Sequence, residues 1–398
     1  MAVPKLSKQE IVNALKFIDE KGVPEHNVSM KYVLVSENGK TYPPKYVVAV
    51  ADHLANGTDI STESFGSEDA RNCLEHLGFV IETKQQSEGY RNPFSSMLIE
   101  SKNLIFRGAP GTGKSYLARE IAADIVSDGY FDDYTLLTDE QKKQVEFVQF
   151  HPSYDYSDFV EGLRPKLNAD GTMGFTLQDG IFKKFVARAR ENYENAQSSA
   201  EKPKKYIFII DEINRGEISK IFGELFFAID PGYRGRAGEI STQYSNLHSD
   251  PDEKFYIPEN VYIIGTMNDI DRSVDSFDFA MRRRFRFVEL KADERLEMLA
   301  SLGDEGLKDE AIRRMKALNE EIVGVEDLNE NYQIGAAYFL KLKTLSFDQL
   351  WTDYLQPLLQ EYVRGMYDEE GLMDRFAKAY GYQRPVRGDA NEAAEDPG

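Results

Sequence analysis

Hydrophobic and polar positions follow different periods along the chain, and these periods divide it into regions. In residues 1–88, apolar positions three and four residues apart predict amphipathic helices, and short apolar runs between turn residues predict strands. The stretch SKQEIVNALKFIDEKG shows the helical period clearly. It also carries the signals of helix ends, a serine in the N-cap position and Gly22 at its end. We therefore expect residues 1–88 to fold as a small α+β head domain.

The pattern changes after the polar stretch 83–93, which has the composition of a linker. From Leu104 onward, short apolar runs alternate with helical segments; the runs are LIF, EFVQF, YIFII, VYIIGTM and FRFVEL. Such runs are typical of parallel strands, because helices cover both faces of a parallel sheet. Residues 94–290 are therefore predicted to form an α/β domain with a parallel sheet.

Helical periods dominate the rest of the chain, as in DEAIRRMKALNEEIV and FDQLWTDYLQPLLQEYV. They predict a helical lid over residues 291–383. The acidic ending GDANEAAEDPG has too few apolar residues to build a core, so residues 384–398 are expected to be a disordered tail.

The net charge narrows the range of partners. The 398 residues include 48 Lys and Arg against 68 Asp and Glu, a formal charge of −20. This field repels nucleic acid and anionic membranes, so DNA contact must be local or come from a partner. The sequence begins without an apolar signal region and has no apolar run of membrane-spanning length, so we expect a soluble, cytoplasmic protein with no membrane partner. Cys73, the only cysteine, excludes an internal disulfide and a cysteine-rich zinc site.

The strongest candidate for chemistry is GAPGTGKS, residues 108–115, which follows a predicted strand and opens a predicted helix. This context matches a phosphate-binding loop, where glycines let backbone N–H groups turn toward phosphate oxygens. Lys114 is expected to reach the outer phosphates, and the Ser115 hydroxyl is a candidate Mg²⁺ ligand. A glycine-rich turn without a ligand is the alternative. The predicted nucleotide-binding residues are Gly108, Ala109, Pro110, Gly111, Thr112, Gly113, Lys114, Ser115 and Tyr116.

The second motif is YIFIIDEINR at 206–215, a buried strand that ends in two carboxylates. Asp211 is expected to hold Mg²⁺ through water, and Glu212 is the candidate that polarises the attacking water. A lone Asp-Glu pair more often only ends a strand. Together with the phosphate loop, however, the pair predicts a Mg²⁺-dependent nucleoside triphosphatase.

A third predicted strand, VYIIGTMND, ends in Asn268. A polar residue there could orient the attacking water against the terminal phosphate. The alternative is a helix N-cap, a task that Asp269 or Asp271 could also perform.

Three consecutive arginines, Arg282, Arg283 and Arg284, stand between a predicted helix and a strand. A helix C-terminus favours cations, so one or two of them could simply be solvated. Three in a row point around most of a helical turn and cannot share one ion pair. In a ring-shaped NTPase this position faces the neighbouring subunit's site, where an arginine finger contributes about 10³ to 10⁵ in rate. A DNA-binding patch is a weaker alternative, because the acidic surroundings oppose phosphate binding.

In this order, the motifs resemble an AAA+ ATPase module. More specifically, four stretches between residues 94 and 365 are similar to the McrB branch, the NTPase subunits of modification-dependent restriction systems. They are FVQFHPSYDYSDFVEGLRP (147–165), IIDEINRGEISKIFGEL (209–225), TMNDIDRS (266–273) and RRRF (282–285). The resemblance implies a homo-oligomeric ring, a hexamer, that moves on modified DNA. It also implies a separate McrC-like nuclease subunit that stimulates hydrolysis.

Two departures from the McrB pattern bear on the nucleotide. Asp269 and Ile270 stand where the MNTADRS-type signature has Thr and Ala, and the guanine-reading NKxD motif is absent, so both GTP and ATP stay open. QIGAAYF at 333–339 resembles the lid motif near the second sensor but contains no arginine. By this resemblance, Lys114 and the arginines of the neighbouring subunit must neutralise more of the phosphate charge.

The head domain loosely resembles small head domains of modification-dependent restriction proteins, and we expect a possible role in recognising DNA or another target. Residues 1–90 carry 9 basic and 13 acidic side chains, which disfavours backbone binding but not a pocket for a flipped base. Tyr32, Tyr42 and Tyr46 are candidates for stacking on such a base; core packing is the alternative. VIETK at 80–84 resembles part of a nuclease core, but such triplets are common on edge strands, so no nuclease activity of its own is expected.

The leading hypothesis is thus an McrB-type motor that couples GTP or ATP hydrolysis to DNA recognition and translocation. The alternatives are a MoxR-like or dynein-related AAA+ remodeller of proteins and a nucleotide-switched binding module with little turnover.

Overall fold

The computed structural model describes residues 4–24, 32–36, 40–58, 60–62, 64–83, 89–168, 170–270 and 279–383. The chain divides into two compact units. One holds the N-terminal segment and most of the central sheet; the other holds residues 106–114, 267–274 and 287–398. Asp271 and the predicted tail 384–398 lie outside the described residues.

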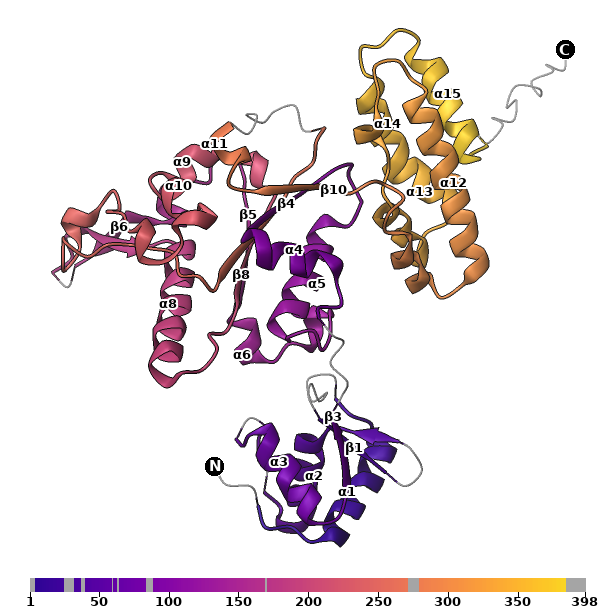
Figure 1. Ribbon diagram of the computed structural model, residues 1–398. Coiled ribbons are helices and arrows are strands. Elements are labelled where there is room, and N and C mark those ends of the chain that lie inside the picture. Colours follow the sequence, from indigo (N-terminus) through magenta and orange to yellow (C-terminus); the bar gives the residue numbers. More distant parts are fainter. Residues whose placement is uncertain are drawn as a thin grey trace, which may run out of the picture. The chain divides into compact units, whose positions relative to one another are not determined.

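The N-terminal segment folds as an α+β domain, as its periods predict. Its described strands form an antiparallel sheet in the order β2-β1-β3, and a core that includes Ile11, Leu34, Val47 and Leu74 is fully buried. Ser7 and Glu10 cap the N-terminus of the first helix with a reciprocal capping box. The elements are α1 (Lys8–Lys21), β1 (Tyr32–Val35), β2 (Thr41–Tyr42), α2 (Pro44–Asn56), α3 (Ser67–His76) and β3 (Val80–Thr83) (Figure 1).

The proposed base-stacking tyrosines belong to this packing. The relative exposure of Tyr32 is 4% and that of Tyr42 is 5%, and Tyr46 packs against the same core. The hydroxyl of Tyr42 donates to Asp19, and Arg71 donates to the hydroxyl of Tyr32. The packing alternative therefore holds for Tyr32 and Tyr42, because neither ring presents a face on which a base could stack.

A five-stranded sheet in the order β10-β4-β9-β8-β5 forms the centre of the described α/β region. Its strands are β4 (Asn103–Arg107), β5 (Val145–Gln149), β8 (Tyr206–Asp211), β9 (Val261–Thr266) and β10 (Arg286–Glu289). The β5–β8 and β8–β9 pairs are parallel, and β8 and β9 are almost entirely buried, which explains their continuous apolar runs. The predicted parallel α/β fold is confirmed.

Helices cover both faces of this sheet. The connection through α5 (Lys114–Val126) runs from β4 to the edge strand β5, and the connection through α8 (Ile181–Ser199) returns from β5 to β8. Because such crossovers are right-handed, opposite directions of travel place the two helices on opposite faces, as Figure 1 shows. The other helical elements here are α4 (Pro93–Ser101), η2 (Tyr134–Leu136), α6 (Asp139–Lys142), α7 (Tyr156–Phe159), η3 (Ile213–Arg215), α9 (Ile218–Phe222), α10 (Leu225–Ala228), η4 (Pro231–Tyr233), η5 (Gly235–Gly238), η6 (Ser245–Leu247) and α11 (Phe279–Arg282).

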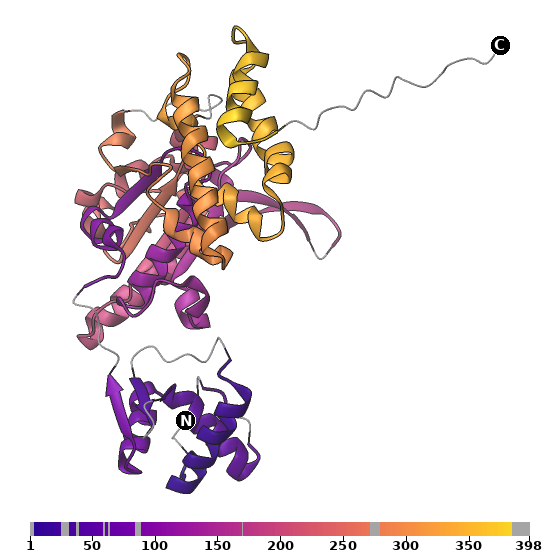
Figure 2. The same cartoon turned by 90° about the vertical axis from the view of Figure 1, so that its right-hand side faces the viewer.

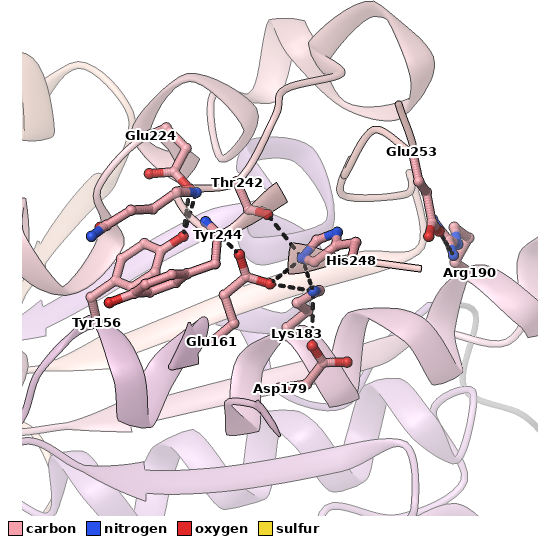
Figure 3. A network of polar contacts seen from close by, with 11 residues as sticks. Tyr156, Glu161, Asp179, Lys183, Arg190, Glu224, Thr242, Tyr244, His248 and Glu253 are labelled. Carbon is pink, nitrogen blue, oxygen red and sulfur yellow. Dashed lines mark hydrogen bonds and ion pairs between the residues drawn. The ribbon is translucent and has the colours of Figure 1, made fainter. Parts of the chain in front are cut away.

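A hairpin of β6 (Glu161–Leu167) and β7 (Met173–Asp179) interrupts the path from β5 to α8 and extends away from the sheet, in magenta in Figure 2. Its outer residues Leu167, Met173 and Phe175 are exposed, whereas its base is fixed. There Glu161 accepts hydrogen bonds from Lys183 Nζ and His248 Nε2 and from the backbone N–H of Tyr244 (Figure 3). We call Glu161, Lys183, His248 and Tyr244 the hairpin cluster.

The C-terminal region is helical, as predicted, and has its own core around Phe339, Trp351, Phe376 and Tyr380. Its elements are η7 (Leu296–Leu302), α12 (Glu305–Val323), η8 (Glu330–Tyr332), η9 (Ala336–Lys343), α13 (Phe347–Leu350), a π turn (Trp351–Leu355), α14 (Gln356–Val363) and α15 (Glu369–Tyr380). The π turn comes just before Pro357, whose missing N–H would otherwise interrupt an α-helical ladder. Of the helices described here, none is both long and apolar enough to cross a membrane.

Candidate nucleotide site

The glycine-rich loop 108–113 connects β4 to α5 in a conformation that requires glycine. Gly108 has φ 138° and Gly111 has φ 78°, both in a region that L side chains rarely adopt. A Cβ atom at Gly108 would lie 2.3 Å from the carbonyl oxygen of Leu290, and one at Gly111 would lie 2.5 Å from the ring of Tyr338. The loop is therefore compact and closely packed.

Lys114 turns its ammonium group into this loop. Its Nζ donates to the carbonyl oxygens of Gly108 and Ala109 at 3.0 and 2.7 Å, and it lies 3.4 Å from Thr112 Oγ1. The residue is 7% exposed. A cation held by weak neutral acceptors at the start of α5 can exchange them for phosphate oxygens, which bind an ammonium more strongly.

Ser115 and Asp211, both predicted metal ligands, are in direct contact. Ser115 Oγ donates to Asp211 Oδ1 at 2.5 Å, and Thr266 Oγ1 donates to the same oxygen at 2.6 Å. Hydrogen bonds from the described residues reach only Oδ1 of this carboxylate. Mg²⁺ prefers hard oxygen ligands and usually takes one or two protein groups besides water and phosphate, so this hydroxyl and carboxylate fit it.

Glu212 directly follows Asp211 and adopts a left-handed conformation with φ 51° and ψ 44°. Its backbone N–H donates to Thr266 Oγ1 at 3.2 Å. Its carboxylate is 17% exposed and pairs with Arg215 at 3.3 Å. A non-glycine residue in this conformation is strained, and such strain is concentrated at functional sites.

Asn268 lies just past the end of β9 and is partly buried. The backbone N–H of the preceding Met267 donates to the carbonyl oxygen of Phe106, so Asn268 continues a segment bonded to the strand that leads into the phosphate loop. Asp269 is more enclosed: its side chain is 9% exposed, 3.7 Å from Arg107. Burial raises the pKa of Asp269, although the Arg107 charge opposes this shift.

The three arginines differ in their surroundings. Arg282 and Arg283 are exposed at the end of α11. The Arg284 side chain is only 8% exposed, with Nε 3.8 Å from Asp230 Oδ2, and its guanidinium lies over the Phe226 ring at 5.7 Å. Arg284 is therefore part of its own subunit's core, which disfavours it as a residue that reaches a neighbour. Its backbone carbonyl also accepts a hydrogen bond from Asn103.

Sequence reasoning missed two features of the site. Thr266 stands only two residues before Asn268, but its contacts with Asp211 and Glu212 join segments that are distant in sequence. The lid motif 333–339 contains no arginine, but its backbone contacts the phosphate loop: the N–H groups of Gly335 and Ala337 donate to the carbonyl oxygens of Pro110 and Gly111 at 3.0 and 2.9 Å. No periodicity or motif could have signalled these backbone bonds.

Three family models match successive parts of the chain. Residues 5–83 match the ScoMcrA-like N-terminal head domain, residues 103–285 match the AAA domain of the dynein-related subfamily, and residues 310–370 match the McrB alpha-helical lid domain. These matches agree with the head, sheet and lid of the predicted fold. The predicted boundaries at residues 88, 94 and 290 stay predictions.

Two curated proteins are similar in sequence. The type IV methyl-directed restriction enzyme EcoKMcrB subunit of Escherichia coli K12 is 34% identical over 350 residues, which cover 84% of this chain and 65% of that protein. The type II restriction enzyme BsuMI component YdiS of Bacillus subtilis 168 is 27% identical over 232 residues, which cover 53% of this chain and 63% of that protein. The chain thus spans slightly less than two thirds of each relative. Among solved structures, Caenorhabditis elegans PCH-2 aligns with a TM-score of 0.24 at 9% identity, covering 94% of this chain and 93% of that one.

Proposed function

Because this chain is an McrB-like AAA+ protein, we propose that it hydrolyses GTP or ATP with Mg²⁺ and couples hydrolysis to DNA recognition and translocation in a modification-dependent restriction system. The observation that carries the proposal is the contact of Ser115 with Asp211 directly after the phosphate loop. This pairing of a hydroxyl and a carboxylate is what a magnesium-bound triphosphate requires.

Each residue of the site has a proposed task. The backbone N–H groups of 108–113 and the Lys114 ammonium bind the phosphates, and Ser115 and Asp211 hold the ion, Asp211 through water. Mg²⁺, when bound, neutralises charge on the phosphate oxygens. Glu212 accepts a proton from the attacking water, and Asn268 orients that water against the terminal phosphate. Glu212 must first separate from Arg215, with which it pairs at 3.3 Å.

Arg282 and Arg283 are the proposed fingers that complete a neighbouring subunit's site in a ring, which we propose to be a hexamer. Their exposure supports this choice over the buried Arg284. An arginine finger contributes about 10³ to 10⁵ in rate, which corresponds to about 4 to 7 kcal/mol of barrier. A surface ion pair contributes at most about 1 kcal/mol.

The trans arrangement can be tested by mixing two inactive variants. A ring that contains Arg283→Ala subunits and Lys114→Ala subunits should recover part of the activity, because one supplies an intact loop and the other an intact finger. Arg282→Ala and Arg284→Ala should be mixed in the same way. If none of the three arginine variants is rescued in steady-state hydrolysis, action between subunits is wrong.

The proposed partners are modified DNA and a McrC-like nuclease subunit. The name of the Escherichia coli relative, a methyl-directed restriction enzyme subunit, supports this direction. The formal charge of −20 argues that DNA contacts are local or shared with the partner.

The experiment that tests this function measures hydrolysis of GTP and ATP, with and without methylated DNA and a McrC-like nuclease subunit. We expect the nuclease and modified DNA together to raise the rate. The dynein-related AAA match over residues 103–285 supports one alternative, a protein-remodelling ATPase. Hydrolysis that responds to neither DNA nor nuclease, but to a protein substrate, would establish that alternative instead.

A further inference from the structure

Thr266, the last residue of β9, connects the two acidic residues of the site. Its side-chain hydroxyl donates to Asp211 Oδ1 at 2.6 Å and accepts the backbone N–H of Glu212 at 3.2 Å. The residue is 2% exposed. The Thr266 hydroxyl thus contacts both the side chain of Asp211 and the backbone of Glu212.

A buried threonine in a strand often serves only to fill space, but two features distinguish Thr266. A hydroxyl has one hydrogen to donate and two lone pairs, and here it both donates and accepts toward residues that β8 brings to the sheet edge. A valine of the same shape would leave the Glu212 N–H without this acceptor, and buried amides are rarely left unbonded.

The contact with Asp211 fixes how the carboxylate is presented. Ser115 and Thr266 approach the same oxygen, Oδ1, from two different elements, α5 and β9. Hydrogen bonds that the described residues make to this side chain end on Oδ1, so the two hydroxyls hold the carboxylate plane and leave Oδ2 available for a metal-bound water.

The contact with Glu212 fixes where the second carboxylate points. Successive side chains of an extended strand point to opposite faces, so a Glu212 that continued β8 would point away from the face of Asp211. The left-handed conformation, φ 51° and ψ 44°, breaks this alternation. This conformation is unfavourable for a non-glycine residue, and the N–H bond to Thr266 Oγ1 stabilises it.

We propose that Thr266 is a positioning residue for triphosphate hydrolysis: its hydroxyl orients Asp211 toward the Mg²⁺ ion and holds Glu212 in the conformation that directs its carboxylate at the attacking water. This inference rests on the proposed nucleotide hydrolysis and adds a residue that acts through others, without touching the nucleotide.

The test compares Thr266→Val, which keeps the shape and removes the hydroxyl, with Thr266→Ser, which keeps the hydroxyl. Replacing residues that orient metal ligands typically changes metal affinity or activity by about 10- to 100-fold. We expect Thr266→Val to lower kcat by about that factor. KM for the Mg²⁺-triphosphate should rise only by the Mg²⁺-dependent affinity that this variant loses. Thr266→Ser should stay within about threefold of the parent chain. Ile263→Val on the same strand is the matched control for a small volume change.

Two readouts do not depend on turnover. Binding of a fluorescent triphosphate analogue should tighten on addition of Mg²⁺ in the parent chain and in Thr266→Ser, and much less in Thr266→Val, while affinity in EDTA stays the same. Hydrogen exchange of the peptide that contains Glu212, without nucleotide, should be faster in Thr266→Val. A merely space-filling role would move neither readout.

Equal kcat, Mg²⁺ response and exchange in Thr266→Val and the parent chain would overturn the inference. If Thr266→Val does not fold, Thr266→Ala against Thr266→Ser decides by the same readouts. Absence of hydrolysis of GTP and ATP by the parent chain with DNA and nuclease would instead reject the proposed function. The two failures are thus distinguishable.

Discussion

Two carboxylates of the α/β domain, Glu161 in the hairpin cluster and Asp211 in the nucleotide site, are surrounded in opposite ways. Both oxygens of Glu161 are occupied: Oε2 by Lys183 at 2.5 Å and His248 at 2.7 Å, and Oε1 by the Tyr244 N–H at 3.1 Å (Figure 3). In Asp211, the described residues bond only Oδ1, through two hydroxyls. A saturated carboxylate can only hold structure together, whereas a half-open one can bind something else.

The partners of the two groups differ in charge as well. Glu161 faces the cation Lys183, which Asp179 also pairs at 2.8 Å, so the counter-charge of Glu161 comes from the protein itself. Among the described residues, the hydrogen-bond partners of Asp211 are two neutral hydroxyls, so its charge can serve a bound cation. Burial and acidity alone would therefore not distinguish a carboxylate that stabilises the fold from one that takes part in the reaction.

The largest effect should come from a change in the nucleotide site. Glu212→Gln should lower hydrolysis by about 10²- to 10⁴-fold, because it removes the proposed proton acceptor. Triphosphate binding and the unfolding temperature should stay close to those of the parent chain, and trapped triphosphate should be recovered from the purified complex. Normal turnover in a quenched-flow assay would reject Glu212 as the base.

The next largest effect should come from a change in the hairpin cluster. Glu161→Ala leaves Lys183 without one buried partner and should destabilise the α/β domain by about 3 to 5 kcal/mol. Calorimetry or urea unfolding measures this loss. The matched control is Glu253→Ala, which breaks the more exposed pair with Arg190 and should change stability by at most about 1 kcal/mol. Equal effects of the two variants would contradict the structural role of Glu161.

A smaller effect is expected where the lid motif meets the phosphate loop. A Cβ at Gly335 would lie 2.2 Å from the carbonyl carbon of Gly111, so Gly335→Ala should displace the loop. Such overpacking costs about 1 to 3 kcal/mol, and we expect triphosphate affinity to fall about tenfold or more. Gly324→Ala, where the nearest atom would be 3.4 Å away, is the control. Unchanged affinity of Gly335→Ala in isothermal titration would rule out the coupling.

The smallest effect concerns pH. Burial by itself raises the pKa of Glu161, but hydrogen bonds from Lys183, Thr242 and His248 outweigh it, so the pKa lies below its ordinary value of 4.5. A depressed folded-state pKa means that the group stabilises the fold above pH 4.5 and loses this contribution as the pH falls through the lower folded value. Glu161→Gln should therefore flatten the acid limb of the stability profile below that pH. An acid limb as steep as that of the parent chain would contradict this.

The parts of the fold and of the site that could be predicted from the sequence differ in a similar way. The loop 108–115, Asp211 and Glu212 were predictable because each motif is contiguous, and its chemistry follows from neighbouring residues. The parallel sheet and the helical lid followed from hydrophobic periods. Thr266, the Gly335 backbone bond and the burial of Arg284 were not predictable, because each depends on contacts between segments distant in sequence. The hairpin cluster gave no signal either, since Glu161 and His248 are 87 residues apart.

The most direct test of the half-open carboxylate is the effect of Mg²⁺ on triphosphate affinity, measured by isothermal titration for the parent chain, Asp211→Asn and Glu161→Gln, at a temperature where all three are folded. Mg²⁺ should tighten binding to the parent chain and to Glu161→Gln, and have little effect on Asp211→Asn. Full tightening in Asp211→Asn, or its loss in Glu161→Gln, would contradict the assignment of Asp211 to the metal and Glu161 to the fold.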